Sequence, residues 1–196
     1  MANQYDVIVI GSGPAGGIAA AGCQGAGLRV AVVEHRGFGG TCPLRGCNPK
    51  KVLVGAAEAI NRSADLKGKG IAHNSRIDWP GLIGFKRTFT EPVSSSQEQG
   101  LKKKGIETSS GKARFTGKTE ITVNGRTLTG NKIVIATGAI AGTLPIPGKE
   151  HLIEGEAFME VESLPESVTF IGGGYISFEF AHIAARAGAK VTILEM

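Results

Sequence analysis

Two stretches of the chain place apolar and glycine-rich segments in the same order. Residues 7–10 read Val-Ile-Val-Ile before a glycine-rich turn, and residues 168–171 read Val-Thr-Phe-Ile before a second such turn. The run over residues 7–10 is short and wholly apolar, which predicts a strand buried on both faces, as in a parallel sheet. The Ala- and Gly-rich segment 14–26 predicts a helix packed closely on that sheet. Gly27 ends this helix, and a second strand follows.

The second stretch repeats the first in register. Five pairs of positions correspond at a constant offset of 161 residues. They are Gly11 and Gly172, Gly13 and Gly174, Gly16 and Ser177, Gly27 and Gly188, and Glu34 and Glu195. Each copy therefore predicts the order strand, glycine turn, helix, strand and acid, which is the frame of a dinucleotide-binding βαβ unit.

The residue types in this frame suit a dinucleotide. The first glycine makes the turn, the second lets the backbone approach the pyrophosphate, and a small third residue allows close packing of helix on strand. The pyrophosphate lies at the helix N-terminus, where N–H groups and the helix dipole favour an anion. Glu34 and Glu195 end their second strands, where a carboxylate can accept hydrogen bonds from a ribose. Two frames predict two dinucleotides; two ligand-free glycine turns of an α/β core are the alternative.

The region between the copies predicts helices and an antiparallel insertion. Residues 42–66, after a cysteine loop, and residues 85–104 favour helices, with a break at Trp79-Pro80. Asn124-Gly125 is a strong hairpin signal between alternating runs. The alternating runs predict strands at 112–115, 120–123, 126–128 and 132–135.

These elements define an α/β fold class with two domains. Residues 1–163 predict a Rossmann-like domain, in which a parallel sheet carries a β-meander insertion. Residues 164–196 predict the first βαβ unit of a second Rossmann domain. The boundary is expected at Ser163-Leu164-Pro165.

Two of the three cysteines lie directly after the first βαβ unit, within the segment 39–51. Cys42 and Cys47 are too far apart in sequence to bridge easily within a regular helix. A loop entering a helix can bring their Cα atoms to the ~5.5–6 Å that a disulfide needs. We therefore predict a redox-active pair, with zinc binding and a purely structural disulfide as the alternatives.

The surroundings of the pair favour a thiolate. A helix N-terminus and the basic residues Arg45, Lys50 and Lys51 would all lower the pKa of a nearby thiol, which promotes thiol–disulfide exchange near neutral pH. The third cysteine, Cys23, lies in the Ala/Gly helix and is interpreted as a small core residue.

Composition and charge narrow the function classes. The chain has 196 residues, of which 30 are glycine, and a formal net charge of +5. Its densest basic run, residues 102–104, has no aromatic residue near it and is typical of a solvated helix end, so no nucleic-acid partner is expected. No apolar run approaches the ~20 residues of a membrane helix, and the N-terminus does not resemble a signal peptide. We expect no membrane association and a cytoplasmic location.

Taken in order, these motifs resemble the class I pyridine nucleotide–disulfide oxidoreductases, which include glutathione reductase, dihydrolipoamide dehydrogenase and mercuric reductase. The resemblance covers nearly the whole chain. It rests on residues 11–16, 39–51, 136–139 and 172–179. It implies an oxidoreductase in which hydride passes from NAD(P)H to FAD, the flavin reduces the Cys42–Cys47 disulfide, and the dithiol reduces a small disulfide or similar redox substrate.

The resemblance implies which residues hold the cofactors. The positions implied for FAD are Gly11, Ser12, Gly13, Pro14, Ala15, Gly16, Glu34, His35, Gly40, Thr41, Cys42, Gly46, Cys47, Lys51, Ala113, Ala136, Thr137 and Gly138. The positions implied for NAD(P)H are Gly172, Gly174, Tyr175, Ile176 and Glu195. Glu195 favours NADH, because a carboxylate beside the ribose repels a 2′-phosphate. No metal is expected.

The resemblance also implies catalytic roles. Cys47 corresponds to the thiol in charge-transfer contact with the flavin, and Cys42 to the thiol that attacks the substrate. Lys51 corresponds to a lysine near flavin N5 that is partnered by Glu179, where a cation would stabilise the anion left as hydride arrives. Tyr175 corresponds to a tyrosine that covers the flavin until nicotinamide enters. An ordinary surface acid at Glu179 and a packing aromatic at Tyr175 are the alternatives.

The cysteine segment departs from the family pattern, which usually reads Cys-x-Asn-x-Gly-Cys-x-Pro-Ser-Lys. Arg45 and Lys50 add charge close to the pair, which leaves the substrate open. The sequence reaches Met196 just after the second acid, so we expect the N-terminal part of a longer, homodimeric enzyme that does not turn over by itself. A non-catalytic flavin-binding fragment is the alternative. A flavoprotein monooxygenase would not need the cysteine pair.

Overall fold

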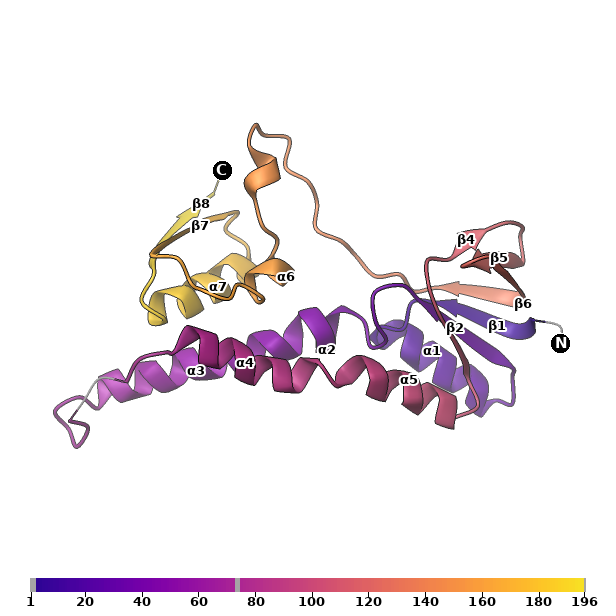
Figure 1. Ribbon diagram of the computed structural model, residues 1–196, viewed down its shortest axis with the longest axis horizontal. Coiled ribbons are helices and arrows are strands. Elements are labelled where there is room, and N and C mark those ends of the chain that lie inside the picture. The colour runs from indigo at the N-terminus through magenta and orange to yellow at the C-terminus, as the bar shows by residue number, and fades with distance from the viewer. Residues whose placement is uncertain (1–2, 73–74, 196) are drawn as a thin grey trace. The chain divides into compact units, whose positions relative to one another are not determined.

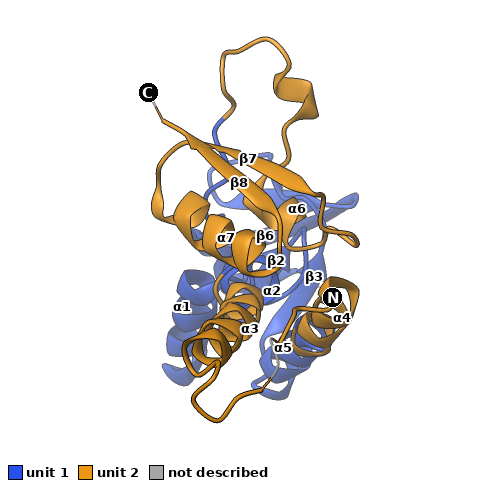
Figure 2. Ribbon diagram, turned by 90° about the vertical axis from the view of Figure 1, so that its left-hand side faces the viewer, with its two compact units in different colours: residues 1–46, 90–142 blue, residues 47–89, 143–196 orange. Residues whose placement is uncertain are grey.

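The computed structural model describes residues 3–72 and 75–195, and Figure 1 labels its elements. The chain divides into two compact units, each built from two sequence segments (Figure 2). Unit 1 comprises residues 1–46 and 90–142, and unit 2 comprises residues 47–89 and 143–196. Each unit has its own sheet and its own hydrophobic core.

Unit 1 is built on a six-stranded sheet of order β3-β2-β1-β6-β5-β4. Its strands are β1 (Gln4–Ile10), β2 (Val30–Glu34), β3 (Glu107–Ser110), β4 (Arg114–Phe115), β5 (Glu120–Val123) and β6 (Arg126–Ile135). β1 pairs in parallel with β2 and β6, and β2 pairs in parallel with β3, whereas β4, β5 and β6 pair antiparallel. The predicted parallel sheet with a β-meander insertion is confirmed.

The apolar run of β1 is buried on both faces of this sheet. Val7 and Val9 join a cluster with Phe38, on the face where helix α1 (Pro14–Gly25) packs. Ile8 joins a second cluster with buried residues of β5 and β6. Since helix covers one face and the meander the other, β1 has no solvated side, which explains its uninterrupted apolar sequence.

The helices between the two frames differ from the prediction. Residues 85–104 are helical for most of their length, as expected, but they belong to two helices and not to one, α4 (Trp79–Thr90) and α5 (Val93–Lys103). Pro92 precedes α5 and has no N–H to donate, so it interrupts a continuous helix. Trp79-Pro80 begins α4 instead of breaking the chain, since proline suits the first turn of a helix.

The strands of the meander differ in one place. The two strands expected at 126–128 and 132–135 form the single strand β6, which pairs with both β1 and β5. The hairpin at Asn124-Gly125 is confirmed: its residues have φ of 49° and 79°, as in a type I′ turn. β3 was not predicted, because Glu107–Ser110 is short and polar.

Unit 2 packs helices against a two-stranded parallel sheet. β7 (Ser167–Ile171), α7 (Tyr175–Arg186) and β8 (Lys190–Leu194) form the predicted βαβ unit. Helix α3 (Cys47–Asp65) packs on α7, and α4 and the short α6 (Gly155–Phe158) contribute to the same core. Phe158 lies at the centre of this core. Its ring centroid lies 6.0, 5.6 and 4.8 Å from those of Trp79, Phe170 and Phe180.

The two βαβ frames share one hydrogen-bond pattern as well as one sequence pattern. Corresponding strand pairs are Val7 with Val30 and Val168 with Val191. Corresponding turn bonds, both 2.8 Å, are Gly11 N to Val33 O and Gly172 N to Leu194 O. The repeat in sequence is therefore a repeat in backbone geometry.

Candidate functional site

The first glycine turn lies between β1 and α1, against the end of β6. Gly11 has a φ of +102°, and a Cβ on it would lie 2.1 Å from the carbonyl oxygen of Ala136. Any other residue would be strained there and would collide with backbone. A Cβ on Gly16 would lie 2.0 Å from Gly11 O, so α1 packs closely on the turn only because that position is glycine.

The N-terminus of α1 faces this turn and is lined by backbone. Gly13 is the N-cap and makes no side-chain cap, while Pro14 and Ala15 follow on the exposed surface. The first N–H groups of a helix have no acceptor within the helix, and together with the helix dipole they suit a phosphate. The residues present at this turn therefore fit a dinucleotide pyrophosphate.

Glu34, at the end of β2, is bonded on both carboxylate oxygens. It is 7% exposed. One oxygen accepts hydrogen bonds from the N–H groups of His35 and Arg36, at 2.8 and 2.9 Å. The other accepts from the N–H and hydroxyl of Ser12, at 2.9 and 2.7 Å. Burial alone would raise the pKa of Glu34, but these bonds outweigh it and hold the pKa below its usual value. The His35 side chain is exposed, with Nδ1 3.6 Å from Glu34.

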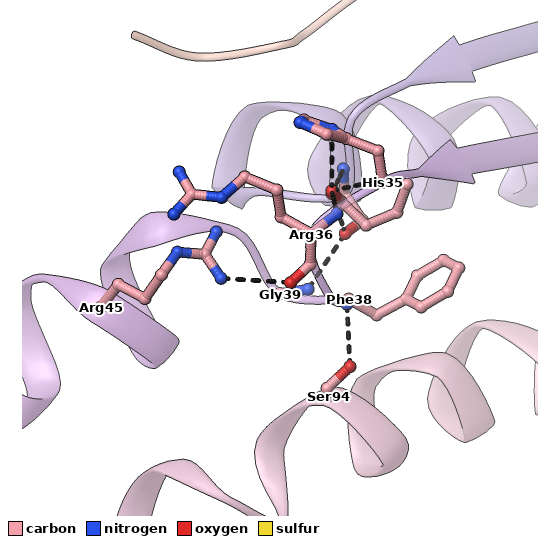
Figure 3. A network of polar contacts seen from close by, with 8 residues as sticks. His35, Arg36, Phe38, Gly39, Arg45 and Ser94 are labelled. Carbon is pink, nitrogen blue, oxygen red and sulfur yellow. Dashed lines mark hydrogen bonds and ion pairs between the residues drawn. The ribbon is translucent and has the colours of Figure 1, made fainter. Parts of the chain in front are cut away.

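The loop after Glu34 is held by hydrogen bonds to other parts of unit 1, one of which joins Phe38 to Ser94 (Figure 3). Phe38 is buried, and its N–H donates to Ser94 Oγ of α5 over 3.0 Å. Gly39 N donates to Ser12 Oγ of the glycine turn over 3.0 Å. No sequence motif pointed to Ser94, because it lies 56 residues from Phe38 and belongs to neither repeat.

This loop brings Gly40 onto the glycine turn and leads into α2 (Thr41–Arg45). Gly40 has a φ of +73°, and a Cβ on it would lie 2.4 Å from Gly13 Cα. Gly40 is the N-cap of α2, whose second residue is the half-buried Cys42. The side chain of Arg45 donates back to Arg36 O over 3.3 Å (Figure 3). Cys42 thus lies two residues after a glycine whose backbone packs on the first glycine turn.

Cys47 is the first residue of α3, and Gly46 separates it from α2. Gly46 has φ −137° and ψ −106°, a conformation that ends the preceding helix. Cys47 is exposed and its thiol is free, so the Cys42–Cys47 disulfide stays a prediction. Cys23 is partly buried and packs against the core of unit 1.

On α3, the lysine that contacts Glu179 is Lys50. Its Nζ donates to a carboxylate oxygen of Glu179 and lies 5.1 Å from the centroid of the Tyr175 ring. Lys51 is exposed. The expected pairing of Lys51 with Glu179 is therefore wrong. Neighbouring residues of a helix point about 100° apart, so only one of two adjacent lysines can face α7.

The second glycine turn, before α7, is more open than the first. Gly172 has a φ of +97°, but a Cβ on it would meet no atom within 4 Å. Glu195 is exposed and accepts a hydrogen bond from Gly173 N. Gly174 is the N-cap of α7 and makes no side-chain cap, so this helix end also suits a phosphate. The exposed residues that begin α7 are Tyr175 and Ile176.

The remaining positions expected at FAD lie after β6 and before β4. Ala136 N donates to Ile10 O over 2.8 Å, which places residues 136–138 beside the first turn. Thr137 and Gly138 are exposed, and Gly138 has a φ of +74°. Ala113 packs against the core on the meander face of the sheet.

Other kinds of site were sought over residues 3–72 and 75–195. Lys102, in the basic run, forms an ion pair with Glu98 of the same helix at 2.8 Å. Within these residues no three or more His, Cys, Asp or Glu side chains gather as metal ligands would. None of the helices described there has the length and apolar content needed to cross a membrane.

The fold and the site together combine two glycine turns of the dinucleotide-binding type with a cysteine segment. A Rossmann-like unit carries a backbone-lined phosphate turn, and Cys42 follows from a loop packed on that turn. A second βαβ unit repeats the turn, and Lys50, Glu179 and Tyr175 gather at its helix.

The chain belongs to the pyridine nucleotide-disulphide oxidoreductase family, whose model matches residues 5–196. It is 31% identical to a dihydrolipoyl dehydrogenase of Acholeplasma laidlawii, over all of this chain and 61% of that protein. It is 33% identical to a glutathione reductase of Burkholderia cepacia, over 97% of this chain and 42% of that protein.

A solved structure gives the same fold. The HOCl-induced flavoprotein disulfide reductase RclA of Escherichia coli is 32% identical and superposes with a TM-score of 0.85, over 97% of this chain and 42% of that chain. The chain thus spans roughly two fifths to three fifths of the length of these relatives.

Proposed function

We propose that the chain is the FAD-binding part of a flavoprotein disulfide reductase that takes electrons from a pyridine nucleotide. Residues 1–163 would form the FAD-binding domain, and residues 164–196 would begin the NAD(P)-binding domain. The observation that carries this proposal is the packing of Gly40, two residues before Cys42, on Gly13 of the phosphate turn. That packing links a nucleotide site to a redox-type cysteine.

The first turn suits FAD because its glycines carry no side chains, so a pyrophosphate can approach the backbone there closely. Gly11, Gly13 and Gly16 would hold the pyrophosphate with the N-terminus of α1. Glu34 would face the ribose as an anion, since its pKa is held low. When bound, FAD supplies two-electron transfer between a pyridine nucleotide and the cysteine pair.

The cysteines would carry the exchange with substrate. The Cys42 thiolate attacks one sulfur of a substrate disulfide, the substrate S–S bond breaks, and the leaving sulfur takes a proton. The Cys47 thiolate then attacks the sulfur of Cys42, which forms the Cys42–Cys47 disulfide and releases the second substrate thiol. Two electrons pass from the pair to the substrate, so each cycle needs two electrons to restore the dithiol.

Lys50 would take the role that the resemblance gave to Lys51. Its side chain is 18% exposed, and its ammonium group is bonded to Glu179 and lies near the Tyr175 ring. A cation that a hydrogen bond already holds in place can stabilise negative charge that develops during a reaction, because it does not have to reorient. Tyr175, at the N-terminus of α7, is exposed and would be the group that nicotinamide displaces.

The second turn would hold the pyridine nucleotide, with NADH favoured over NADPH. Glu195 lies exposed at the end of β8, where its carboxylate would meet the ribose hydroxyls and repel a 2′-phosphate. A small disulfide is the proposed substrate, by similarity to relatives named for lipoyl and glutathione chemistry. We further propose a cytoplasmic, homodimeric parent protein without nucleic-acid or membrane partners.

A visible spectrum of the purified 196-residue chain tests this proposal. After incubation with FAD and gel filtration, we expect a bound flavin spectrum. Dithiothreitol should add a long-wavelength charge-transfer band. Cys47→Ser should remove that band, whereas Cys42→Ser should leave it, because only Cys47 is assigned to the flavin. A chain that elutes without flavin would refute the proposed cofactor.

The alternative is a flavin-binding fragment without redox exchange through the cysteines. It predicts bound flavin but no dithiothreitol-dependent band in any variant. Mass spectrometry of the alkylated chain before and after an oxidant also separates the two. Formation of an intramolecular Cys42–Cys47 disulfide supports the reductase.

A further inference from the structure

Ser12 is the only side chain in the first glycine turn that bonds to the loop carrying Gly39, among the residues the structure describes. Its hydroxyl donates to Glu34 over 2.7 Å and accepts the N–H of Gly39 over 3.0 Å. The side chain is 7% exposed, so these bonds are shielded from water. A hydroxyl can make both bonds at once, since it has one proton and two lone pairs.

The loop has a second tether that does not reach the turn. Phe38 N donates to Ser94 Oγ, which lies on α5. Of these two serine hydroxyls, Ser12 alone joins the loop to the phosphate site, and Ser94 joins it to the helical layer. The two bonds fall on consecutive N–H groups of the loop, which makes Ser94 a matched comparison for Ser12.

The second βαβ unit shows that this tether is not needed to form such a turn. Gly173 stands where Ser12 stands in the first copy, and Glu195 accepts only the backbone N–H there among the bonds found. The turn geometry is nevertheless repeated, with Gly172 at φ +97° against +102° for Gly11. The Ser12 hydroxyl therefore serves something particular to the first copy.

What distinguishes the first copy is that its loop leads to Cys42. Gly39 leads directly to Gly40, whose added Cβ would come within 2.4 Å of Gly13 Cα, and Gly40 is the N-cap of the helix that carries Cys42. A phosphate held on the amides of the turn would stiffen Ser12 and Gly13. Both of these residues contact the Gly39–Gly40 backbone, and a stiffer turn would stiffen the start of α2.

We propose that Ser12 is a positioning residue that couples occupancy of the phosphate turn to the reactivity of Cys42. The inference rests on the proposed binding of FAD at this turn. Cys42 is only partly exposed, so its rate of alkylation should rise when its loop opens locally. Occupancy of the turn opposes that opening through Ser12 and Gly39, and a reductase gains a thiol whose exposure depends on its cofactor.

The test uses ADP, which carries the pyrophosphate and adenosine of FAD but no isoalloxazine that could cover Cys42. The chain is reduced and treated with iodoacetamide, with and without saturating ADP. Trypsin cleavage after Arg36 and Arg45 then places Cys42 and Cys47 in separate peptides. In the wild type we expect ADP to slow alkylation of Cys42 at least threefold.

Each variant is compared at an ADP concentration that calorimetry shows to saturate that variant. Under these conditions Ser12→Ala should lose this protection, so that its rates with and without ADP agree within 1.5-fold. Ser12→Thr, which keeps the hydroxyl, should restore it. Ser94→Ala should keep the protection, because it removes a bond to the same loop but not to the turn. Ser12→Gly, which copies Gly173, is a second variant should the alanine variant fold poorly, and the alkylation rate of Cys23 reports folding in each.

The outcomes separate the inference from the proposed function. ADP binding with undiminished protection of Cys42 in both Ser12→Ala and Ser12→Gly would overturn the role of Ser12 and leave the nucleotide site standing. Equal loss of protection in Ser94→Ala would also overturn it, since any loosening of the loop would then suffice. A wild-type chain that binds neither ADP nor FAD would overturn the proposed function and this inference together.

Discussion

At the scale of single residues, Glu34 is a buried carboxylate whose charge is stabilised by the hydrogen-bond donors around it. Its two oxygens accept four hydrogen bonds, from Ser12, His35 and Arg36. Because these donors favour the ionised form more than burial opposes it, the pKa of Glu34 lies below its usual value. The carboxylate therefore stabilises the fold as an anion, and that contribution must depend on pH.

We expect Glu34→Gln to lower the free energy of unfolding by about 2 kcal/mol at pH 7, because an amide cannot accept all four bonds. A carboxyl whose folded pKa is depressed stabilises the fold above its unfolded pKa of about 4.3 and loses this effect as pH falls through the folded pKa. The difference between wild type and variant should shrink as pH falls below about 4. Urea unfolding at pH 7 and pH 3.5 measures it.

The control for this prediction is Glu91→Gln, because Glu91 is an exposed acid of the same unit. It should show no comparable loss at either pH. A penalty for Glu34→Gln that stays constant from pH 7 to pH 3.5 would mean that shape, not charge, is what Glu34 provides.

The adjacent lysines of α3 show where residue-level inference failed. The resemblance named Lys51, but the ammonium group that meets Glu179 is that of Lys50. A motif fixes sequence position, whereas the direction of a helical side chain depends on where the helix begins and how it packs. With lysines at both positions, the motif could not decide between them, and the packing of α3 on α7 did.

We expect Lys50→Met to destabilise unit 2 and Lys51→Met to leave it nearly unchanged. Glu179 is 41% exposed, so the pair is partly solvated and should contribute no more than about 1 kcal/mol. A double-mutant cycle of Lys50→Met with Glu179→Gln, followed by urea unfolding, gives the coupling energy. Coupling between Lys51 and Glu179 instead would contradict the assignment.

At the scale of elements, α4 holds the segment that leads from α6 to β7. Lys86 of α4 has no exposed surface, and its Nζ donates to Met159 O over 3.0 Å and to the Glu160 carboxylate. Trp79 Nε1, at the start of the helix, donates to Val161 O over 2.8 Å. A buried ammonium group is costly unless it is bonded, and these acceptors offset the cost.

Replacement of Lys86 by methionine should therefore be costly although methionine fills much the same volume. It leaves Met159 O without its donor, at about 1–3 kcal/mol. Arg87→Met is the matched control, because the next side chain bonds to Glu160 and Glu162 at the surface. We expect a distinctly smaller loss there. Thermal unfolding of both variants measures the difference, and equal losses would show that burial of Lys86 is unimportant.

The elements themselves were predictable where a local pattern set them. The runs 7–10 and 168–171, the helix over 14–26 and the Asn124-Gly125 hairpin were found in the structure, because each depends on periodicity or turn residues. β6 was predicted in two pieces, since residues 129–131 carry no apolar alternation, yet pairing with β1 and β5 makes it continuous. Non-local pairing of this kind leaves no local trace.

The site was predictable to the same extent. The glycine turns followed from the motif, and their φ values and close approaches fit it. The bonds that Ser94 and Lys86 make could not be foreseen, because they join residues 56 and 73 positions apart with no shared pattern. The sequence thus identified the glycine turns better than the hydrogen bonds that hold the segments around them.

At the scale of the whole molecule, the two βαβ frames have the same backbone geometry at the glycine turn but different neighbouring residues. Gly11 and Gly172 share a positive φ and the same bond to the end of the second strand. In the first frame β6 pairs with β1, and the carbonyl oxygen of Ala136 lies where a Cβ on Gly11 would come within 2.1 Å of it. In the second frame the sheet has two strands, and the described residues place nothing within 4 Å of a Cβ on Gly172.

This difference between the turns predicts that the same glycine-to-alanine substitution lowers the free energy of unfolding by different amounts at Gly11 and at Gly172. Gly172→Ala should cost about 1–2 kcal/mol, because alanine is strained at positive φ. Gly11→Ala carries the same strain and adds a Cβ 2.1 Å from a backbone oxygen, so β6 or the turn must shift. We expect it to cost at least about 2 kcal/mol more and to abolish FAD binding, which Gly172→Ala should leave intact.

Hydrogen exchange resolved to each unit, with FAD titration of both variants, measures these effects separately. Similar losses of protection in the two units would mean that the turn's own φ sets the cost and the neighbouring strand adds nothing. A larger loss for Gly11→Ala would mean that β6 locks the first turn into a fixed shape. A fixed turn is preorganised for a ligand that stays bound.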